Sequence, residues 1–317
     1  MVNSYKNSYI LKTKYFSVVF IFIFLILFHK TTVGIEFIDT TTIDNSCNLK
    51  KNLITYSFPA AYCASTVGLY QLWYADYPLS SFHFFNDNKE WLQIDKIGHV
   101  YTAYMFREMS YKSAKWGCFS ENHALWIGGS AVLLFLTTIE IFDGFSKEWG
   151  FSYGDIISNV AGWSLFTTQQ HYWNEQRIRM KFSFTNTNYP EYRPNLLGKN
   201  KLEQVLKDYN GQTYWFSFNI ASFLNNENIP KWLNLAVGYG GDGMTGGYEN
   251  PEFYNRKPLP HFDRNRQFYI SPDIDLTKIP VESKLLKTVL TVLNILKIPM
   301  PTIEFTDNKL KFRPLYF

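Results

Sequence analysis

The sequence has few cysteines and few charged residues for its length. Only 3 cysteines occur among 317 residues, which excludes a framework of several disulfides, although one bridge can form in an oxidising compartment. No Cys-x-x-Cys or Cys/His spacing indicates a structural zinc site. Charged residues make up 18 % of the chain and the formal net charge is +4. Because the basic residues form no stripe, a nucleic-acid partner is not indicated.

Several catalytic signatures are also missing. The chain contains no Gly-x-Ser-x-Gly elbow and no His-Glu-x-x-His pair. The glycine-rich segment 238–247 lacks the Gly-Lys-Ser/Thr ending of a phosphate loop and the strand–helix context of a dinucleotide site. We expect strand-end turns or a wide loop there, and the sequence identifies no nucleophile, metal or cofactor.

Aromatic residues, in contrast, are abundant. The 28 Phe, 22 Tyr and 9 Trp make up 19 % of the chain, which is typical of a membrane interface, although a large aromatic core would also account for it. Lys6, Lys12 and Lys14 precede an uncharged run at 15–28, which has the length of a signal-peptide core. We therefore predict a signal peptide or an N-terminal anchor in residues 1–34. No Leu-x-x-Cys pattern follows this run, so a lipoprotein anchor is not expected.

Hydrophobic periodicity predicts an α+β fold with a boundary near residue 180. After a polar lead at 35–58, a bundle of about four helices is expected at 59–178, and embedding in a membrane is one alternative for it. Its segment 124–142 carries one charge, Glu140, and is about as long as a short membrane span. Alternating residues predict a β-rich antiparallel domain at 179–317, with strands near 179–185, 214–220, 232–239, 267–276, 302–305 and 309–317 and an amphipathic helix near 284–298.

The most informative polar cluster is Asp95-Lys96-Ile97-Gly98-His99. Asp87-Asn-Lys-Glu90 predicts a capping box that opens the helix carrying it. On that helix Asp95 and His99 are four apart and share a face. The carboxylate could orient the imidazole as a general base or metal ligand; a structural Asp–His pair is the alternative.

Two later clusters have a similar character. Glu140 and Asp143 are three apart, with Lys147 nearby, and two such carboxylates can raise one pKa or bind a divalent cation. Asp155 completes a predicted capping box with Ser152, and Asn159 and Gly162 continue its face, where Asn159 could hydrogen-bond Glu140 or His99 across a helix interface. The hypothetical catalytic residues are therefore His99, Asp95, Glu140 and Asp143, and the supporting polar cluster comprises Lys96, Lys147, Asp155, Asn159 and Gly162.

The order and spacing of these clusters resemble the YfiM-like family of predicted envelope proteins of unknown function. The resemblance covers about residues 90–170. With Trp91–Lys96 before and Tyr192–Asn200 after, the chain looks like the long form found in Bacteroidetes-type bacteria. More distantly it is similar to VanZ-like membrane proteins, through the Asp-Lys-x-x-His and Asp-x-x-x-Asn elements. The resemblance implies an envelope compartment and a set of positions, but no activity, and this chain lacks the lipidation cysteine of the short YfiM form.

Together these features predict a membrane-associated protein of the bacterial cell envelope, on the periplasmic or outer-membrane side. Membrane lipids or envelope components are its expected partners, and a structural or lipid-binding role is the leading hypothesis. One alternative is a metal-assisted or acid/base hydrolase acting on an envelope lipid or glycan. Another is a small outer-membrane β-barrel formed by the C-terminal half, which ends at Phe317, although about six predicted strands are fewer than the usual minimum of about eight. The oligomeric state is not indicated.

Overall fold

The structure is a computed structural model that describes residues 40–74 and 78–317. The predicted signal segment lies outside the described residues. The described residues divide into two compact units, one made of those within 1–86 and 106–163 and the other of 87–105 with 164–317. We call them the helical unit and the sheet unit. The domain boundaries predicted at 34, 58 and 178 stay predictions.

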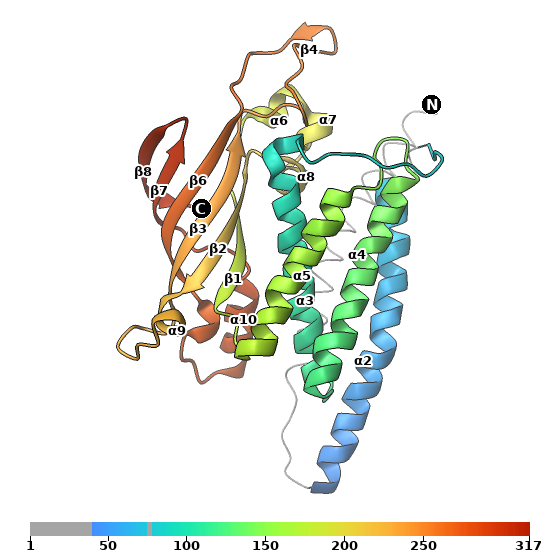
Figure 1. Cartoon of the computed structure of the whole chain (residues 1–317), viewed down its shortest axis with the longest axis vertical. Helices are drawn as coiled ribbons and strands as arrows, with labels where there is room; N and C mark the ends of the chain where they lie inside the picture. Colours follow the sequence, from blue (N-terminus) through green and yellow to red (C-terminus); the bar gives the residue numbers. More distant parts are fainter. Residues whose placement is uncertain (1–39, 75–77) are drawn as a thin grey trace. The chain divides into compact units, whose positions relative to one another are not determined.

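The helical unit is built from long helices (Figure 1). Helix α2 spans Thr40–Leu69 and continues into the π-helical turn η1, Tyr70–Tyr74. The π-helical turn η3, His123–Ile127, leads directly into α4, Gly128–Gly144, which confirms the helix predicted at 124–142. The segment expected as a polar lead is helical from residue 40 onward.

Two further helices contribute residues to both units. Helix α3 spans Ile94–Trp116 and α5 spans Tyr153–Trp173, and each crosses a unit boundary. Both helices agree with the sequence prediction over most of their length.

Small residues allow close helix packing in the helical unit. A Cβ atom at Gly128 would lie 2.8 Å from the Ser110 hydroxyl oxygen, and one at Gly129 would lie 2.7 Å from Nε1 of Trp163. Both distances are too short for a real side chain, so α4 can approach these residues only with glycine at both positions. The small-residue patch at the start of this apolar helix therefore serves helix packing, as its composition predicts.

A disulfide joins Cys47 of α2 to Cys118, just beyond the end of α3. The two residues are 71 apart in sequence, and closing a loop of that length stabilises a fold by about 4 kcal/mol in the chain-entropy description. Cys63 is a free, exposed thiol. The single bridge that the sequence allowed is therefore present, and it is of the kind found in oxidising compartments.

The sheet unit contains a six-stranded antiparallel sheet with strand order β1-β2-β3-β6-β7-β8 (Figure 1). Each of the six strands predicted from the sequence is present, and the α+β fold class is confirmed. The strands are β1 Ile178–Phe184, β2 Gln212–Asn219, β3 Leu233–Asp242, β6 Asn265–Ile274, β7 Met300–Thr306 and β8 Lys309–Tyr316.

Short elements connect these strands. The predicted amphipathic helix is α10, Lys284–Leu293, and the glycine-rich segment forms the end of β3 and the turn after it, as expected. The others are the hairpin of β4 Phe253–Tyr254 and β5 Lys257–Pro258, the helices α6 Tyr189–Tyr192, α7 Pro194–Leu197, α8 Lys201–Lys207 and α9 Ile220–Leu224, and the 3₁₀ turns η2 Glu90–Gln93 and η4 Leu276–Lys278.

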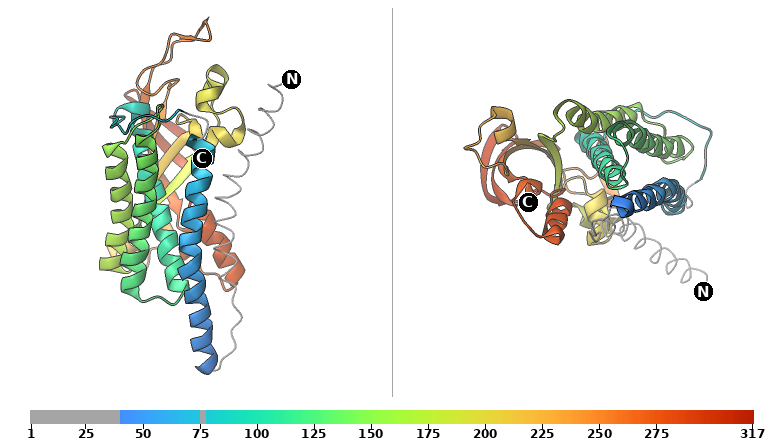
Figure 2. Two further views of the ribbon diagram at one scale, coloured as in Figure 1. Left: turned by 90° about the vertical axis from the view of Figure 1, so that its right-hand side faces the viewer. Right: turned by 90° about the horizontal axis from the view of Figure 1, so that it is seen from below.

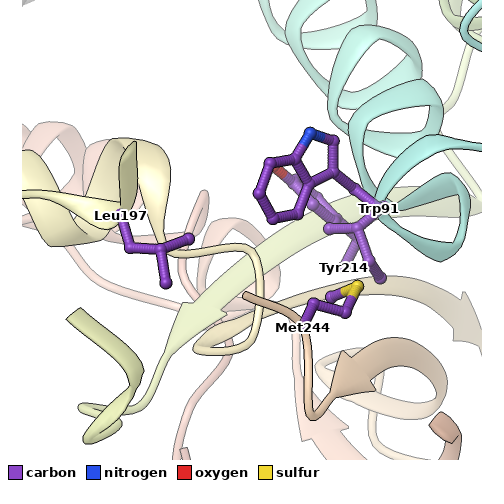
Figure 3. Close-up of a cluster of buried hydrophobic side chains, with 5 residues drawn as sticks. Trp91, Leu197, Tyr214 and Met244 are labelled. Atoms are coloured by element: carbon purple, nitrogen blue, oxygen red, sulfur yellow. The ribbon is translucent and has the colours of Figure 1, made fainter. Parts of the chain in front are cut away.

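A hydrophobic core forms in the sheet unit beside the start of α3. Trp91, Ile94, Leu197, Tyr214 and Met244 are buried together, and Figure 3 shows the side chains of Trp91, Tyr214 and Met244 close to one another. A Cβ atom at Gly98 would lie 2.9 Å from the Tyr214 hydroxyl oxygen. The glycine in the Asp-Lys-x-Gly-His cluster thus permits the close approach of α3 to β2.

The sheet curls on itself, as the view from below in Figure 2 shows. The outer edge of β1 bonds to the segment after α10: the Phe182 amide donates to the Ile295 carbonyl at 3.0 Å, and the Lys297 amide donates to the Phe182 carbonyl at 2.9 Å. The Thr185 hydroxyl donates to the Phe317 carbonyl at 2.7 Å. These contacts link the first strand to the C-terminal part of the chain.

Candidate functional site

The segment before α3 has an unusual backbone. Trp91, Leu92 and Gln93 have φ values of 49°, 50° and 66°, in the left-handed region that non-glycine residues rarely adopt. The Trp91 amide donates to the Gly247 carbonyl at 2.8 Å, and the Tyr239 hydroxyl donates to the Leu92 carbonyl at 2.5 Å. These long-range contacts hold a sharp turn that strains the local backbone.

The helix start predicted at Asp87–Glu90 is therefore wrong. Helix α3 begins at Ile94, directly after this turn. The carboxylate of Asp87 forms an ion pair with Lys96, with Oδ2 and Nζ 2.7 Å apart. The residue expected at the cap thus contributes to the polar cluster of α3.

The predicted cluster on the first turns of α3 forms a compact ionic group in the sheet unit. The Lys96 ammonium lies between two carboxylates, because its Nζ is also 3.0 Å from Oδ2 of Asp95. The Tyr209 hydroxyl donates to Oδ1 of Asp95 at 2.9 Å. Nε2 of His99 is 4.0 Å from the same oxygen, and the side chains of Lys96, Asp95 and His99 are 10 %, 22 % and 29 % exposed.

The surroundings of Asp95 determine its charge. Burial by itself raises the pKa of Asp95, but the positive charges of His99 and Lys96 and the hydrogen bonds from Lys96 and Tyr209 outweigh it, so the pKa lies below its usual value. Asp95 is therefore an ionised acceptor at neutral pH. It can orient His99 or balance the charge of Lys96, but it is unsuited to act as a general acid.

In the helical unit, the two predicted carboxylates have different partners. Glu140 is buried and its Oε1 accepts from Nδ2 of Asn159, a buried residue of α5, at 3.5 Å. Asp143 accepts from the Tyr74 hydroxyl at 2.7 Å. Burial and the neighbouring Asp143 carboxylate raise the pKa of Tyr74, so its hydroxyl stays a donor. The predicted Glu140–Asn159 contact across the helix interface is therefore present.

The remaining predicted residues have simpler roles. The Asp155 amide donates to the Ser152 hydroxyl oxygen at 3.1 Å, and α5 begins at Tyr153, so Ser152 caps this helix as predicted. Gly162 is buried in α5. Lys147 is exposed and forms no ion pair with any residue in the described ranges, so it does not neutralise Glu140 or Asp143 there.

The structure therefore brings the predicted site residues together in two groups. Asp95, Lys96 and His99 form one group in the sheet unit, and Glu140 and Asn159 form the other in the helical unit. A single site formed by both groups would combine residues of both units, and such a site stays a prediction.

One ionic group was missed from the sequence. Inside the curled sheet, Asp273 of β6 pairs with two lysines: Oδ2 is 2.8 Å from Nζ of Lys181, and Oδ1 is 3.6 Å from Nζ of Lys297. The Ser217 hydroxyl also donates to Asp273 at 2.6 Å. All four residues are fully buried. They come from four distant segments, and the only local signal is that Lys181, Ser217 and Asp273 occupy polar positions of alternating strands.

A family model matches residues 83–169, and its description is "Predicted periplasmic lipoprotein (DUF2279)". The match covers the region that carries both groups of predicted site residues. Neither a curated protein nor a solved structure matches the chain. The match supports an uncharacterised family of envelope proteins, whereas the YfiM-like and VanZ-like resemblances are not confirmed by it and stay resemblances.

The predicted localisation in the cell envelope, on the periplasmic or outer-membrane side, is confirmed by this match. The word lipoprotein in the family description concerns a lipid-modified cysteine, and the matched region contains one cysteine, Cys118. Its sulfur is bonded to Cys47, the first cysteine of the sequence. In this structure both cysteines are therefore joined in a disulfide.

Proposed function

We propose that this protein is a structural, lipid-associated component of the cell envelope, whose polar groups hold its elements together. The observation that carries the proposal is that the predicted catalytic carboxylates already bond to neighbouring segments. Asp95 accepts from Tyr209, Asp143 from Tyr74, and Glu140 from Asn159. Removing a buried acceptor from such a pair leaves its donor unsatisfied, which costs stability. We therefore expect these carboxylates to stabilise the fold.

Helix α4 with η3 supports membrane association. Within the described ranges, His123–Gly144 is the one helix that is long and apolar enough to cross a membrane. Only 28 % of its most apolar stretch of 18 residues is buried inside the protein. The core helix of a soluble protein would be mostly buried. Ile127, Leu134 and Ile141 are exposed and recur every seventh residue, so they form one apolar stripe along this helix.

Exposed aromatic residues near the end of α4 also fit a membrane surface. The Phe82 ring lies 5.3 Å from the Phe84 ring and 5.2 Å from the Phe145 ring, and Phe84 stacks on Tyr153 at 4.9 Å. All four side chains are exposed. Aromatic residues are enriched where an apolar helix meets the lipid headgroups.

The hydrolase alternative makes a different use of His99. The imidazole is partly exposed and lies near an ionised carboxylate, as a metal ligand or general base would. In that case Asp95, Lys96 and His99 would bind a ligand, and the stability of the fold would not depend on them.

Thermal unfolding of the detergent-purified full chain separates the two functions. Under the structural proposal, Asp95→Ala and His99→Ala each lower Tm by several degrees, and neither EDTA nor added Zn²⁺ or Mn²⁺ changes the Tm of the unaltered protein. Lys147→Ala is the matched control and leaves Tm unchanged. Under the metal-assisted alternative, Tm of the unaltered protein rises with metal or falls with EDTA, and His99→Ala removes that response with little loss of stability. That outcome would refute the structural proposal.

A further inference from the structure

The sheet of the sheet unit has many buried polar residues inside, around a small aromatic cluster of Trp215 and Tyr269, and apolar residues outside. Along β3, Asn234, Ala236 and Gly238 are buried, whereas the alternate residues Leu235 and Val237 are exposed. A soluble antiparallel sheet normally shows the opposite alternation, with its apolar face on the core. The other strands follow the same reversed pattern. Buried inward residues include Lys181, Ser183, Trp215, Ser217, Tyr269, Ser271, Asp273, Thr302, Glu304 and Thr306.

Strand register aligns the outward residues in rows across four strands. Val237 is opposite Ile270, Ile270 is opposite Ile303, and Ile303 is opposite Phe312. A second row beside it runs from Tyr239 through Phe268 and Phe305 to Leu310. Eight residues of these rows and of the next outward position on β3 are 42–74 % exposed, and we call them the outer apolar face. They are Leu235, Val237, Phe268, Ile270, Ile303, Phe305, Leu310 and Phe312.

Most charged residues of the same strands occupy the inward positions and are paired. Glu304 of β7 bonds to Arg313 at 2.8 Å and lies 3.5 Å from Lys311, both on β8. Asp273 pairs with Lys181 and Lys297 as described above. Basic residues of β8 thus alternate with Leu310 and Phe312 of the outer apolar face. On β3, β6, β7 and β8 the one charged residue at an outward position is Arg266, near one end of β6, so the outward positions are mostly apolar, as in sheets that face lipid.

Only part of the outside of the sheet is covered within the sheet unit. Tyr101 of α3 packs against Phe182 of β1 and Tyr214 of β2, with ring centroids 5.9 and 5.6 Å apart. The eight residues of the outer apolar face on β3, β6, β7 and β8 remain exposed. Helix α10 adds Leu285, Leu286, Val289 and Leu293, which are also exposed. Contiguous exposed apolar surface of this kind marks interaction or membrane-contact sites.

We propose that the outer apolar face lies against the acyl chains of a lipid bilayer. Strands β3 and β6 have 10 residues each, and about 9–11 residues are needed for a membrane-crossing strand. The face is convex because the sheet curls (Figure 2), so its rows point in diverging directions. Fluid acyl chains can cover such a surface, whereas one second copy of the chain would contact only part of it. The envelope localisation provides the bilayer.

This inference explains why a six-stranded sheet can face lipid without the eight strands of the smallest usual barrel. Strands β1 and β2 are covered by helices, and β1 bonds to residues 295–297 instead of to a further strand. Lipid is therefore needed on one arc of the sheet only. The inference goes beyond the proposed function, which rests on polar groups and on a helix of the other unit.

Site-specific fluorescence tests the proposal. In a Cys63→Ser background that keeps the Cys47–Cys118 disulfide, an environment-sensitive label is attached to Ile270→Cys or to Ile303→Cys. The control is Lys257→Cys, an exposed position in the β4–β5 hairpin. Each full-length variant is reconstituted into vesicles of phosphatidylethanolamine and phosphatidylglycerol, and quenching by doxyl-labelled acyl chains is compared with quenching by aqueous iodide.

We expect the acyl-chain quencher to remove most of the fluorescence at positions 270 and 303 and iodide to remove little, with the reverse at position 257. Iodide quenching at 270 and 303 would place the face in water and overturn the proposal. Protection from both quenchers would indicate a protein contact, such as a second copy, and would also overturn it. A label at Leu134→Cys reports on helix α4 separately, so failure of the helix to enter the bilayer can be distinguished from failure of the outer apolar face.

Discussion

The helical unit and the sheet unit bury ionisable groups in different ways. In the helical unit the two carboxylates singled out by the sequence accept hydrogen bonds from neutral side chains, Asn159 for Glu140 and Tyr74 for Asp143. In the sheet unit Asp273 lies between two fully buried lysines. A neutral partner tolerates loss of the charge, whereas loss of Asp273 leaves two buried lysines without the anion that they share. The comparison therefore leads us to expect that the polar groups found by sequence spacing contribute less to the stability of the fold than the one that was missed.

The strongest test of this difference is Asp273→Asn. It removes the anion from Lys181 and Lys297, and we expect a loss of about 3–5 kcal/mol in the free energy of unfolding, measured by denaturant titration in detergent. The matched control is Asp263→Asn, because Asp263 is 85 % exposed and should change stability by less than about 0.5 kcal/mol. Equal losses of stability in the two variants would show that the buried ion pairs of Asp273 contribute no more to stability than an exposed charge does.

The disulfide gives the next largest effect, and it belongs to the helical unit. The double variant Cys47→Ser/Cys118→Ser should lose about 2–4 kcal/mol. Dithiothreitol should lower Tm of the unaltered protein by a matching amount and leave the double variant unaffected. Cys63→Ser serves as the control, since this thiol is free and exposed. An unchanged Tm after reduction would mean that the bridge does not support the fold.

A smaller loss is expected for Glu140→Ala, about 1–3 kcal/mol, because it removes the acceptor of the buried Asn159 amide. Thermal unfolding monitored by circular dichroism measures it. Lys147→Ala, an exposed change nearby, should have almost no effect. If Glu140→Ala cost more than Asp273→Asn, the contrast between the two units would be reversed.

The smallest effect concerns pH. The pKa of Asp95 in the folded state is lowered below the usual value of about 3.9, so its stabilisation is fully present above about pH 4 and is lost as the pH falls through the folded-state pKa. Denaturation midpoints between neutral and acidic pH should therefore fall less steeply for Asp95→Asn than for the unaltered protein. Parallel pH profiles would contradict the assigned charge of Asp95.

Much of the fold could be predicted because its signals are local. Alternation located all six strands of the sheet, and the apolar run located α4. The start of α3 could not be predicted, because the left-handed backbone of Trp91 and Leu92 depends on bonds to Gly247 and Tyr239, far along the chain. Local capping rules pointed to Asp87 instead, whose carboxylate turned out to pair with Lys96.

The candidate site was predictable to a similar degree. Helical spacing located Asp95 and His99, and the suggestion that Asn159 bonds to Glu140 is borne out. The partners Tyr74 and Tyr209 were missed because they come from other segments and carry no motif. Asp273 was missed for the same reason, since its lysine partners become neighbours only when the sheet curls.

Fractionation of cells that produce the full-length protein tests the central claim, a membrane-associated envelope protein, most directly. After osmotic lysis, membranes are separated from the soluble periplasm by centrifugation and washed with high salt and carbonate. The account predicts that the protein remains in the membrane pellet through both washes and is released by detergent. Recovery of the protein in the soluble fraction without detergent would contradict it.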